Sequence, residues 1–349
     1  MKSNRDNPIL IENDEWICLK CITDERASIF PFGILNNFEI INLNSFDSIY
    51  LSEQVPEFDI FSDAINTNNL DNSNDIDENI VHSINSRYYS CQEFFKINCN
   101  SNSLKLYHTN VNGFSCHVDT LRDFLVQCDT DFDAICISET SYQLDNAISN
   151  NDLLKNYSTP FVTNTKSSKG GVAIFVKENL VVKEREDLKI CTDEFESVWI
   201  EITNKKSKNV IIGCSYRHPH NNNIDDYSNY ISKCLNKLCK ENKEVYLAGD
   251  FNIDLLKYET NNKYQDFYNL LSSSGFLPLI LQPTRITKET SSIIDNIYTN
   301  TFNKESTSGN ILIEIADHLA QFVIVHKELT KMPTSYQYKR DFSKFNEDI

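Results

Sequence analysis

Polar side chains stand where short apolar runs begin or end, and folds often display catalytic groups on the loops at strand ends. Metal-assisted cleavage of a phosphodiester needs a hard carboxylate for the cation and a second carboxylate to orient or deprotonate water. It also needs donors for the phosphate oxygens and a group that stabilises developing negative charge. In that order, the candidates are Glu139 after DAICIS, Asp250 after EVYLAG, Asn110 after LKLYHT with Asn252, and His318 before LAQFVIV.

Each of these residues also has a purely structural interpretation. Glu139 could cap a following helix, and Asn110 or Asp317 could form a turn. Two other catalytic arrangements lack their motifs, because the chain has neither G-x-S-x-G nor G-x-x-x-x-G-K-[ST]. The set therefore favours metal-assisted phosphodiester chemistry over a serine triad or a phosphate-binding loop.

The elements that must position these residues are short apolar strands with a few amphipathic helices between them. Apolar side chains at helical spacing predict helices over 118–128, 224–238 and 264–271, the last closed by Gly275. This mixture predicts two packed sheets with helices on their outer faces, an α/β or α+β sandwich. The predicted strands are LKLYHTNV, DAICIS, GVAIFVK, SVWIEI, NVIIGCSYR, EVYLAGDF, IDNIYT and QFVIVH.

The acidic charge is concentrated near the N-terminus. The chain of 349 residues has a formal charge of −17, and residues 1–100 hold 17 acidic and 6 basic side chains, a net of −11, which leaves −6 for the rest. Affinity for phosphates depends on Lys and Arg, so this balance disfavours tight general binding of duplex DNA and suits a site that collects divalent cations. We find no membrane-spanning run or signal peptide, and the scattered cysteines predict reduced thiols in an intracellular protein.

An ordered set of motifs then identifies a family resemblance over residues 103–328. The motifs resemble those of the endonuclease/exonuclease/phosphatase family, and more narrowly the apurinic-type endonuclease that precedes the reverse transcriptase of non-LTR retrotransposons. The resemblance implies a four-layer, DNase I-like sandwich of two mixed β-sheets flanked by helices. The motifs are HTNVNGF, ISET, GGVAIFVK, ESVWIEI, YRHP, AGDFNIDLL, QPTRIT, SIIDNIYTN and ADHLAQF.

The resemblance also implies roles for individual residues. Glu139 would be the main ligand of Mg²⁺ or Mn²⁺, with Asn110 and Asp317 beside it. Asp250 would activate the attacking water, and His318, oriented by Asp295, would stabilise the phosphorane. Phosphate or leaving-group contacts are implied for Tyr216 and Asn252, and further substrate contacts for Arg217, Arg285 and Asn296, with Lys166 and Lys169 as additional basic candidates.

The flanks of this domain are expected to be of a different kind. Residues 1–59 resemble a remnant of a cysteine-rich, PHD-like region, residues 60–102 an Asn/Asp/Ser-rich acidic linker, and residues 329–349 a tail that leads toward a reverse transcriptase. Cys18 and Cys21 supply two of the four ligands that a closed zinc site needs, so we expect a metal-free remnant there.

These observations predict a Mg²⁺-dependent endonuclease that nicks target DNA for retrotransposition. The resemblance implies action in the nucleus, no membrane attachment and no small-molecule cofactor. Two alternatives stay open: a phosphatase of the same superfamily that acts on a small phosphate ester, and a catalytically idle remnant or interaction protein from a truncated element.

Overall fold

The computed structural model describes residues 10–12, 15–17, 86–97, 103–128, 131–141, 154–163, 169–205, 207–219, 224–287, 289–301, 305–313 and 315–326. The short strands β1 (Leu10–Glu12) and β2 (Glu15–Ile17) pair with each other in antiparallel fashion. Cys18, Cys21, Lys166 and the tail 329–349 lie outside the described residues, as does most of the expected remnant and linker.

Two seven-stranded sheets form the body of the fold. In the first sheet the strands run in the order β13-β16-β12-β11-β10-β8, with β9 beside β10. Strands β11 and β12 are parallel while β10 and β16 run against them, so the sheet is mixed. Its strands are β8 (Val182–Glu184), β9 (Ile190–Cys191), β10 (Phe195–Ile202), β11 (Val210–Arg217), β12 (Glu244–Asp250), β13 (Leu277–Pro278) and β16 (Asp295–Thr299).

The second sheet runs in the order β3-β17-β18-β4-β5-β7-β6 and is also mixed, because β4 and β5 are parallel whereas β18 runs against β4. Its strands are β3 (Ser86–Ser90), β4 (Leu104–Asn110), β5 (Ala134–Ser138), β6 (Phe161–Val162), β7 (Val172–Val176), β17 (Ser306–Leu312) and β18 (Ala320–Val325).

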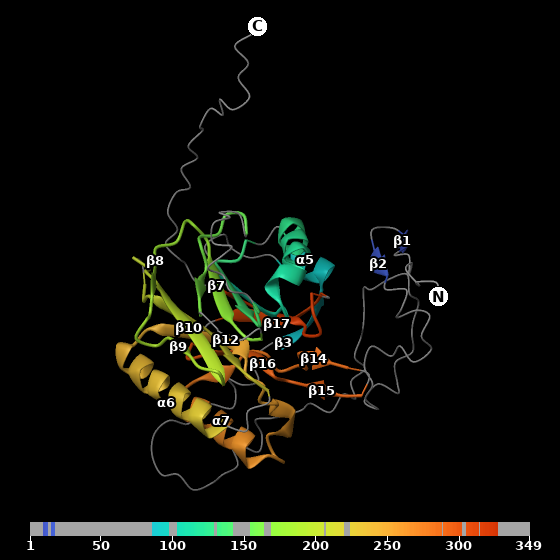
Figure 1. Ribbon diagram of the computed structural model, residues 1–349. Helices are drawn as coiled ribbons and strands as arrows, with labels where there is room; N and C mark the ends of the chain where they lie inside the picture. The colour runs from blue at the N-terminus through green and yellow to red at the C-terminus, as the bar shows by residue number, and fades with distance from the viewer. Residues whose placement is uncertain are drawn as a thin grey trace.

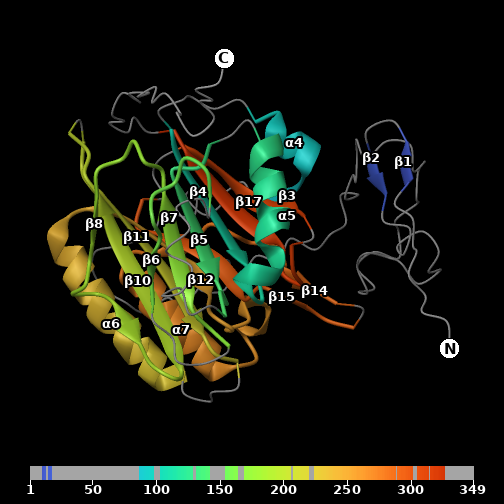
Figure 2. The same ribbon diagram turned by 45° about the horizontal axis from the view of Figure 1, so that its top comes forward.

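Helices cover the outer faces of both sheets (Figures 1 and 2). Helices α6 (Ile224–Glu241) and α7 (Asn262–Ser273) lie on the first sheet, and α4 (Cys91–Phe95) and α5 (Phe114–Gln127) lie on the second. A short 3₁₀ turn, η3 (Leu255–Lys257), follows β12, and the hairpin of β14 (Arg285–Ile286) and β15 (Ser291–Ser292) precedes β16.

Strand alternation builds the layers, because successive side chains of a strand point to opposite faces of its sheet. In β10, Val198 and Ile200 pack into the core between the two sheets, whereas Trp199 packs toward α6. No helix in the described part of the chain combines the length and apolar character needed to cross a bilayer.

The structure confirms the predicted fold class, a four-layer sandwich of two mixed sheets flanked by helices. It also confirms each run predicted as a strand and each of the predicted helices. One boundary is corrected: β3 pairs in parallel with β17, so residues 86–97 belong to the second sheet and its helical cover and not to the linker 60–102. Strand β17, with the sequence STSGNIL, was not predicted because its apolar residues do not alternate.

Candidate active site

A single row of polar side chains crosses the end of the first sheet. The strand register places Glu196 of β10 opposite Tyr216 of β11, Tyr216 opposite Asp250 of β12, and Asp250 opposite Asp295 of β16. All four residues are buried. Residues further along the same strands on this face, such as Val198 and Ile297, lie in the core between the sheets, so the row marks the end of that core.

Asp250 lies at the centre of this row, in the GDFN turn. Its Oδ1 accepts a hydrogen bond from the Asn252 backbone N at 3.0 Å, and its Oδ2 accepts one from Asn110 Nδ2 at 2.9 Å. Burial, and next the negative charge of Asp295, raise the pKa of Asp250 to about 7. A carboxyl group whose pKa lies near neutrality can accept a proton from water and can also hold it.

The second sheet supplies the other carboxylate and the amide that joins the two. Asn110 ends β4, and its Nδ2 also donates to Glu139 Oε1 at 2.9 Å, so one amide bridges Glu139 and Asp250. The Asn110 Oδ1 accepts from the Asn112 backbone N at 2.9 Å, which fixes the orientation of the amide. Tyr216 lies near both carboxylates. Burial, followed by the charges of Glu139 and Asp250, raises the pKa of Tyr216 well above its ordinary range.

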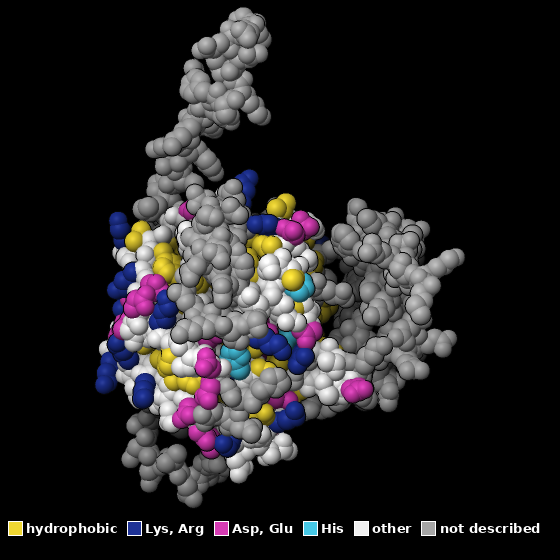
Figure 3. All heavy atoms as spheres, viewed as in Figure 1, with side chains coloured by type: hydrophobic (Ala, Val, Ile, Leu, Met, Phe, Trp, Pro, Cys, Tyr) yellow, Lys and Arg dark blue, Asp and Glu magenta, His cyan; other side chains and the backbone are white. Residues whose placement is uncertain are grey.

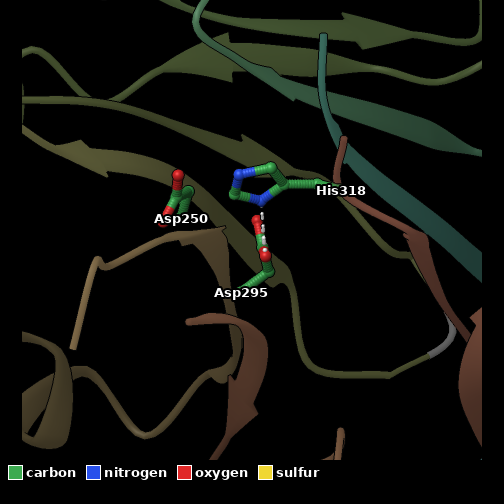
Figure 4. Close-up of side chains that lie close together, drawn as sticks. All are labelled: Asp250, Asp295 and His318. Atoms are coloured by element: carbon green, nitrogen blue, oxygen red, sulfur yellow. Dashed lines mark hydrogen bonds and ion pairs between the residues drawn. The ribbon is translucent and has the colours of Figure 1, made fainter. Parts of the chain in front are cut away.

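The imidazole of His318 lies against Asp295, and Asp250 lies to one side of this pair, as Figure 4 shows. Its Nδ1 lies 2.8 Å from Asp295 Oδ2, and Asp250, Asp295 and His318 each offer a ligand atom within 4.8 Å of the others. Burial alone would lower the pKa of His318, but the charge of Asp295 and the bond to it outweigh burial and raise that pKa to about 9. Burial alone would raise the pKa of Asp295, yet the charge of His318 holds it below its ordinary value. The pair is therefore an imidazolium bound to a carboxylate at neutral pH.

Thr284 positions this pair, although sequence reasoning assigned no role to it. Its buried hydroxyl donates to Asp295 Oδ2 at 2.7 Å and accepts from the Asp295 backbone N at 3.1 Å. The Leu319 backbone N donates to Thr284 O at 2.7 Å, which ties down the loop that carries His318. The sequence feature that could have indicated Thr284 is its position in the QPTRIT motif.

The structure places three of the predicted contact residues outside the cluster, and each stands next to a residue that does lie in it. Arg217 and Asn296 follow Tyr216 and Asp295 along β11 and β16, and the alternation of side chains turns them away from the cluster. Asp317 precedes His318 in a bend before β18. The guanidinium of Arg217 is buried and donates from Nε to Phe251 O at 2.8 Å and from Nη2 to Asn252 O at 2.5 Å. Arg217 therefore braces the GDFN turn.

Asn296 is buried on the far face of β16. Its Nδ2 donates to Ile280 O at 2.8 Å and its Oδ1 accepts from Ile280 N at 3.2 Å, so the described contacts of this amide hold a neighbouring loop. Asp317 pairs instead with Arg285 Nη2 at 2.7 Å, in an exposed ion pair outside the group of Asp250, Asp295 and His318. Its charge still helps to raise the pKa of His318.

Asn252 is half-buried beside Asp250 in the left-handed conformation, with φ of 48°. Its Nδ2 donates to Arg217 O at 2.7 Å, so the described contact of its amide is structural. On the face shown in Figure 3, histidine, acidic and basic side chains lie close together near β12 and β16. Lys169 belongs to the exposed surface.

The side chains present fit a hard divalent cation. Glu139, Asp250 and Asn110 offer oxygen atoms, the donors that Mg²⁺ and Mn²⁺ prefer. The repulsion between Asp250 and Asp295, which raises the pKa of Asp250, is what a nearby positive charge would relieve. His318 is a poorer ligand, because its Nδ1 is bound to Asp295 and its raised pKa keeps the ring protonated.

A four-layer sandwich with a buried cluster of acids and histidine at one end of its sheets defines the DNase I-like class of phosphoesterases. The model of the endonuclease/exonuclease/phosphatase family matches residues 98–318, so the chain belongs to that family, whose members are hydrolases. No curated protein sequence matches the chain.

Solved structures share this fold at low sequence identity. The endonuclease domain of TRAS1, a telomere-specific non-LTR retrotransposon, has 15% identity and a TM-score of 0.51, over 64% of this chain and 100% of that one. The AP endonuclease LMAP from Leishmania major has 11% identity and a TM-score of 0.51, over 71% of this chain and 98% of that one. At such identities the likeness concerns the fold alone.

Proposed function

We propose that this protein is a metal-dependent DNA endonuclease that nicks one strand of target DNA for retrotransposition. The observation that carries this proposal is the His318–Asp295 pair held against Asp250, with Asn110 joining Asp250 to Glu139. Hydrolysis joins the oxygen of water to phosphorus and breaks the bond to the 3′ oxygen. The resulting 3′-hydroxyl could prime reverse transcription.

The residues of the cluster take separate parts in this reaction. Asp250, oriented by the Asn252 backbone and by Asn110, accepts the proton of the attacking water. The imidazolium of His318 donates from Nε2, the nitrogen not bound to Asp295, to a phosphate oxygen whose negative charge grows in the transition state. Tyr216, which its raised pKa keeps protonated, donates to a phosphate oxygen or to the leaving oxygen.

Glu139 and Asn110 would hold a Mg²⁺ or Mn²⁺ ion beside Asp250. When bound, the cation would supply positive charge that polarises the phosphate. The hydrogen bond from the Asn112 backbone N to Asn110 Oδ1 fixes the orientation of the amide that would share in holding the cation.

DNA is proposed as the substrate because of the family and because the fold resembles that of a retrotransposon endonuclease. Exposed cations near the cluster, Lys169 and the Arg285 of the Asp317 pair, are the proposed backbone contacts. Action in the nucleus follows from this proposed substrate. A phosphatase acting on a small phosphate ester is the alternative that the experiment must separate.

The test is nicking of supercoiled plasmid with Mg²⁺, with EDTA as the control for the cation. Asp250→Ala and His318→Ala are each expected to lower the nicking rate by about 10³-fold, since each removes a group that acts in the transition state. Two control variants replace residues of the same types at the other ends of strands that position site residues: Asp131→Ala, which precedes β5 at the end opposite Glu139, and His326→Ala, which follows β18 at the end opposite His318. Both are expected to nick like the wild type.

The nicked product should be extended by a DNA polymerase without prior treatment, because the proposal requires a free 3′-hydroxyl. A well-folded wild-type protein that leaves the plasmid supercoiled but releases phosphate from a small phosphomonoester would make it a phosphatase. A folded protein inert in both assays would make it an idle remnant.

A further inference from the structure

Glu196 is a fully buried carboxylate at the end of the polar row, and the reaction described above leaves it without a part. A buried carboxylate is costly unless donors surround it. Glu196 Oε2 accepts a hydrogen bond from the Thr163 hydroxyl, Oε1 accepts one from the Gly171 backbone N at 3.0 Å, and His218 Nε2 lies 3.6 Å from Oε1. Thr163 directly follows β6 and Gly171 directly precedes β7, so Glu196 joins the first sheet to the ends of two strands of the second.

The segment that Glu196 holds is the one on which the Glu139 loop rests. Gly170 O accepts from the Ser141 backbone N at 2.8 Å, and Gly171 O accepts from the Thr140 backbone N at 3.1 Å. On its other side the loop is bonded to the start of α5, where the Gly113 backbone N donates to Glu139 O at 2.8 Å. Backbone hydrogen bonds therefore hold the Glu139 loop on both sides, to the start of α5 and to the glycine pair Gly170 and Gly171.

This loop needs support because its backbone is strained. Glu139 has φ of 54° and Ser141 has φ of 47°, and both lie in the left-handed region that side chains with a Cβ rarely adopt. Such conformations cost free energy and persist only where the surroundings fix them. Without the bonds to Gly170 and Gly171, the loop would relax and turn the Glu139 carboxylate away from Asp250.

The fit between Glu196 and the glycine pair is close. Gly170 has φ of 103°, and a Cβ at this position would lie 2.7 Å from Glu196 Oε1 and 2.7 Å from His218 Cε1. Thr163 adds to the fit, since its Oγ1 also accepts from the Val172 backbone N at 3.0 Å. We call Glu196, Thr163, Gly170 and Gly171 the Glu196 clamp.

We infer that Glu196 is a positioning residue that sets the affinity of the Glu139 site for its divalent cation, acting through Gly171 and the loop 139–141. This inference rests on the proposed function in one respect, namely that Glu139 binds a cation. It assigns to Glu196 no contact with substrate or with the reacting atoms.

The experiment measures Mn²⁺ binding to the full chain by isothermal titration, without DNA, together with the melting temperature of each variant. Glu196→Ala removes the acceptor for both donors and should weaken Mn²⁺ binding by about 10-fold or more, the usual cost of losing a residue that orients a metal ligand. Glu196→Gln keeps an acceptor for Gly171 N but offers an amide to Thr163, and should fall between Glu196→Ala and the wild type.

The matched control is Glu201→Gln, because Glu201 is a second buried glutamate on β10, at the opposite end of the strand. It should lower the melting temperature while leaving Mn²⁺ affinity within about 2-fold of the wild type, since it contacts no element of the cation site. If Glu196→Ala does not fold, the comparison of Glu196→Gln with Glu201→Gln decides, and a ratio of at least about 3-fold in affinity is expected.

Folded Glu196 variants that bind Mn²⁺ as tightly as Glu201→Gln would overturn the inference, even if the wild type nicks DNA. A wild type that binds Mn²⁺ but does not nick DNA would overturn the proposed function and leave the inference standing. A wild type that binds no Mn²⁺ would overturn the inference and the proposed cation site together.

Discussion

Glu201 at one end of the first sheet is surrounded by cations, whereas Asp250 and Asp295 at the other end face each other across neighbouring strands. Glu201 Oε1 lies 2.8 Å from Lys243 Nζ, and its Oε2 lies 3.3 Å from Arg185 Nη1. Burial alone would raise the pKa of Glu201, but hydrogen bonds from Lys243 and then Asn209 outweigh it and lower the pKa to about 2. The pKa of Asp250 is displaced in the opposite direction, to about 7.

The difference separates charge used for stability from charge used for chemistry. At the end of the sheet that holds Glu201, a carboxylate that ionises beside a cation stabilises the folded state, so the pKa of that carboxylate falls. The carboxylates of the site end share one imidazolium and repel each other, which costs stability until a proton or a cation arrives. Perturbed pKa values of this kind are typical of functional sites.

The largest expected effect on stability concerns the cation at the paired end. Arg185→Ala leaves Glu201, Glu241 and Asp187 without their common partner and should lower the free energy of unfolding by about 3 to 5 kcal/mol, as breaking a buried ion pair does. Urea unfolding monitored by circular dichroism measures it. Lys183→Ala, which removes an exposed cation 3.3 Å from Glu201, should cost less than about 1 kcal/mol. Equal losses in the two variants would contradict the assignment of Arg185 as the central cation.

A smaller effect is expected from the histidine of the site, and it depends on pH. Because the folded-state pKa of His318 is raised to about 9, its contribution to stability is fully present below its ordinary pKa of 6.5 and is lost as pH rises through about 9. The lowered pKa of Asp295 adds stability that is lost as pH falls below about 4.

The comparison is between the wild type and His318→Gln in chelator. The stability difference should be on the order of 3 kcal/mol larger at pH 6 than at pH 10, with His326→Gln as the control. A difference that does not change with pH would show that the imidazole is neutral in the folded protein.

The smallest expected effect is the increase in the free energy of unfolding when a divalent cation binds. The cation should act only at the end of the sheet that holds Glu139 and Asp250. Mg²⁺ at ten times its dissociation constant should add about 1.4 kcal/mol to the free energy of unfolding. Glu139→Gln should abolish this gain, whereas Glu201→Gln, although less stable, should keep it. Thermal melts with and without Mg²⁺ measure it, and a gain retained in Glu139→Gln would place the cation elsewhere.

The strands and helices were readable from the sequence because each is marked by a local pattern. The apolar runs LKLYHTNV, NVIIGCSYR and EVYLAGDF contain β4, β11 and β12, and the residues at helical spacing over 224–238 lie in α6. Strand β3 was missed because its polar neighbours read as a linker, and only its pairing with β17 makes it a strand.

The arrangement of the site was less readable, because it depends on register and on which face each residue occupies. The motifs indicated Asp250, Asp295 and His318, but Arg217, Asn296 and Asp317 stand beside site residues and point elsewhere. The alignment of Glu196 with Tyr216, Asp250 and Asp295 comes from strand register, which one sequence does not reveal. Thr284 and Glu196 lie in recognised motifs, but no role could be assigned to them because their contacts depend on how distant segments come together.

The most direct measurement is the Mg²⁺-dependent nicking rate of two folded variants, one from each end of the sheet. Asp250→Asn should nick about 10³-fold more slowly than the wild type, because it removes the group that accepts the proton of water. It should retain the stability of the wild type in chelator, because the fold disfavours ionisation of Asp250. Glu201→Gln should be less stable and yet nick within about 3-fold of the wild-type rate below its melting temperature. If Asp250→Asn nicks at the wild-type rate, or if both variants lose nicking only in proportion to unfolding, the polar cluster is not the catalytic centre.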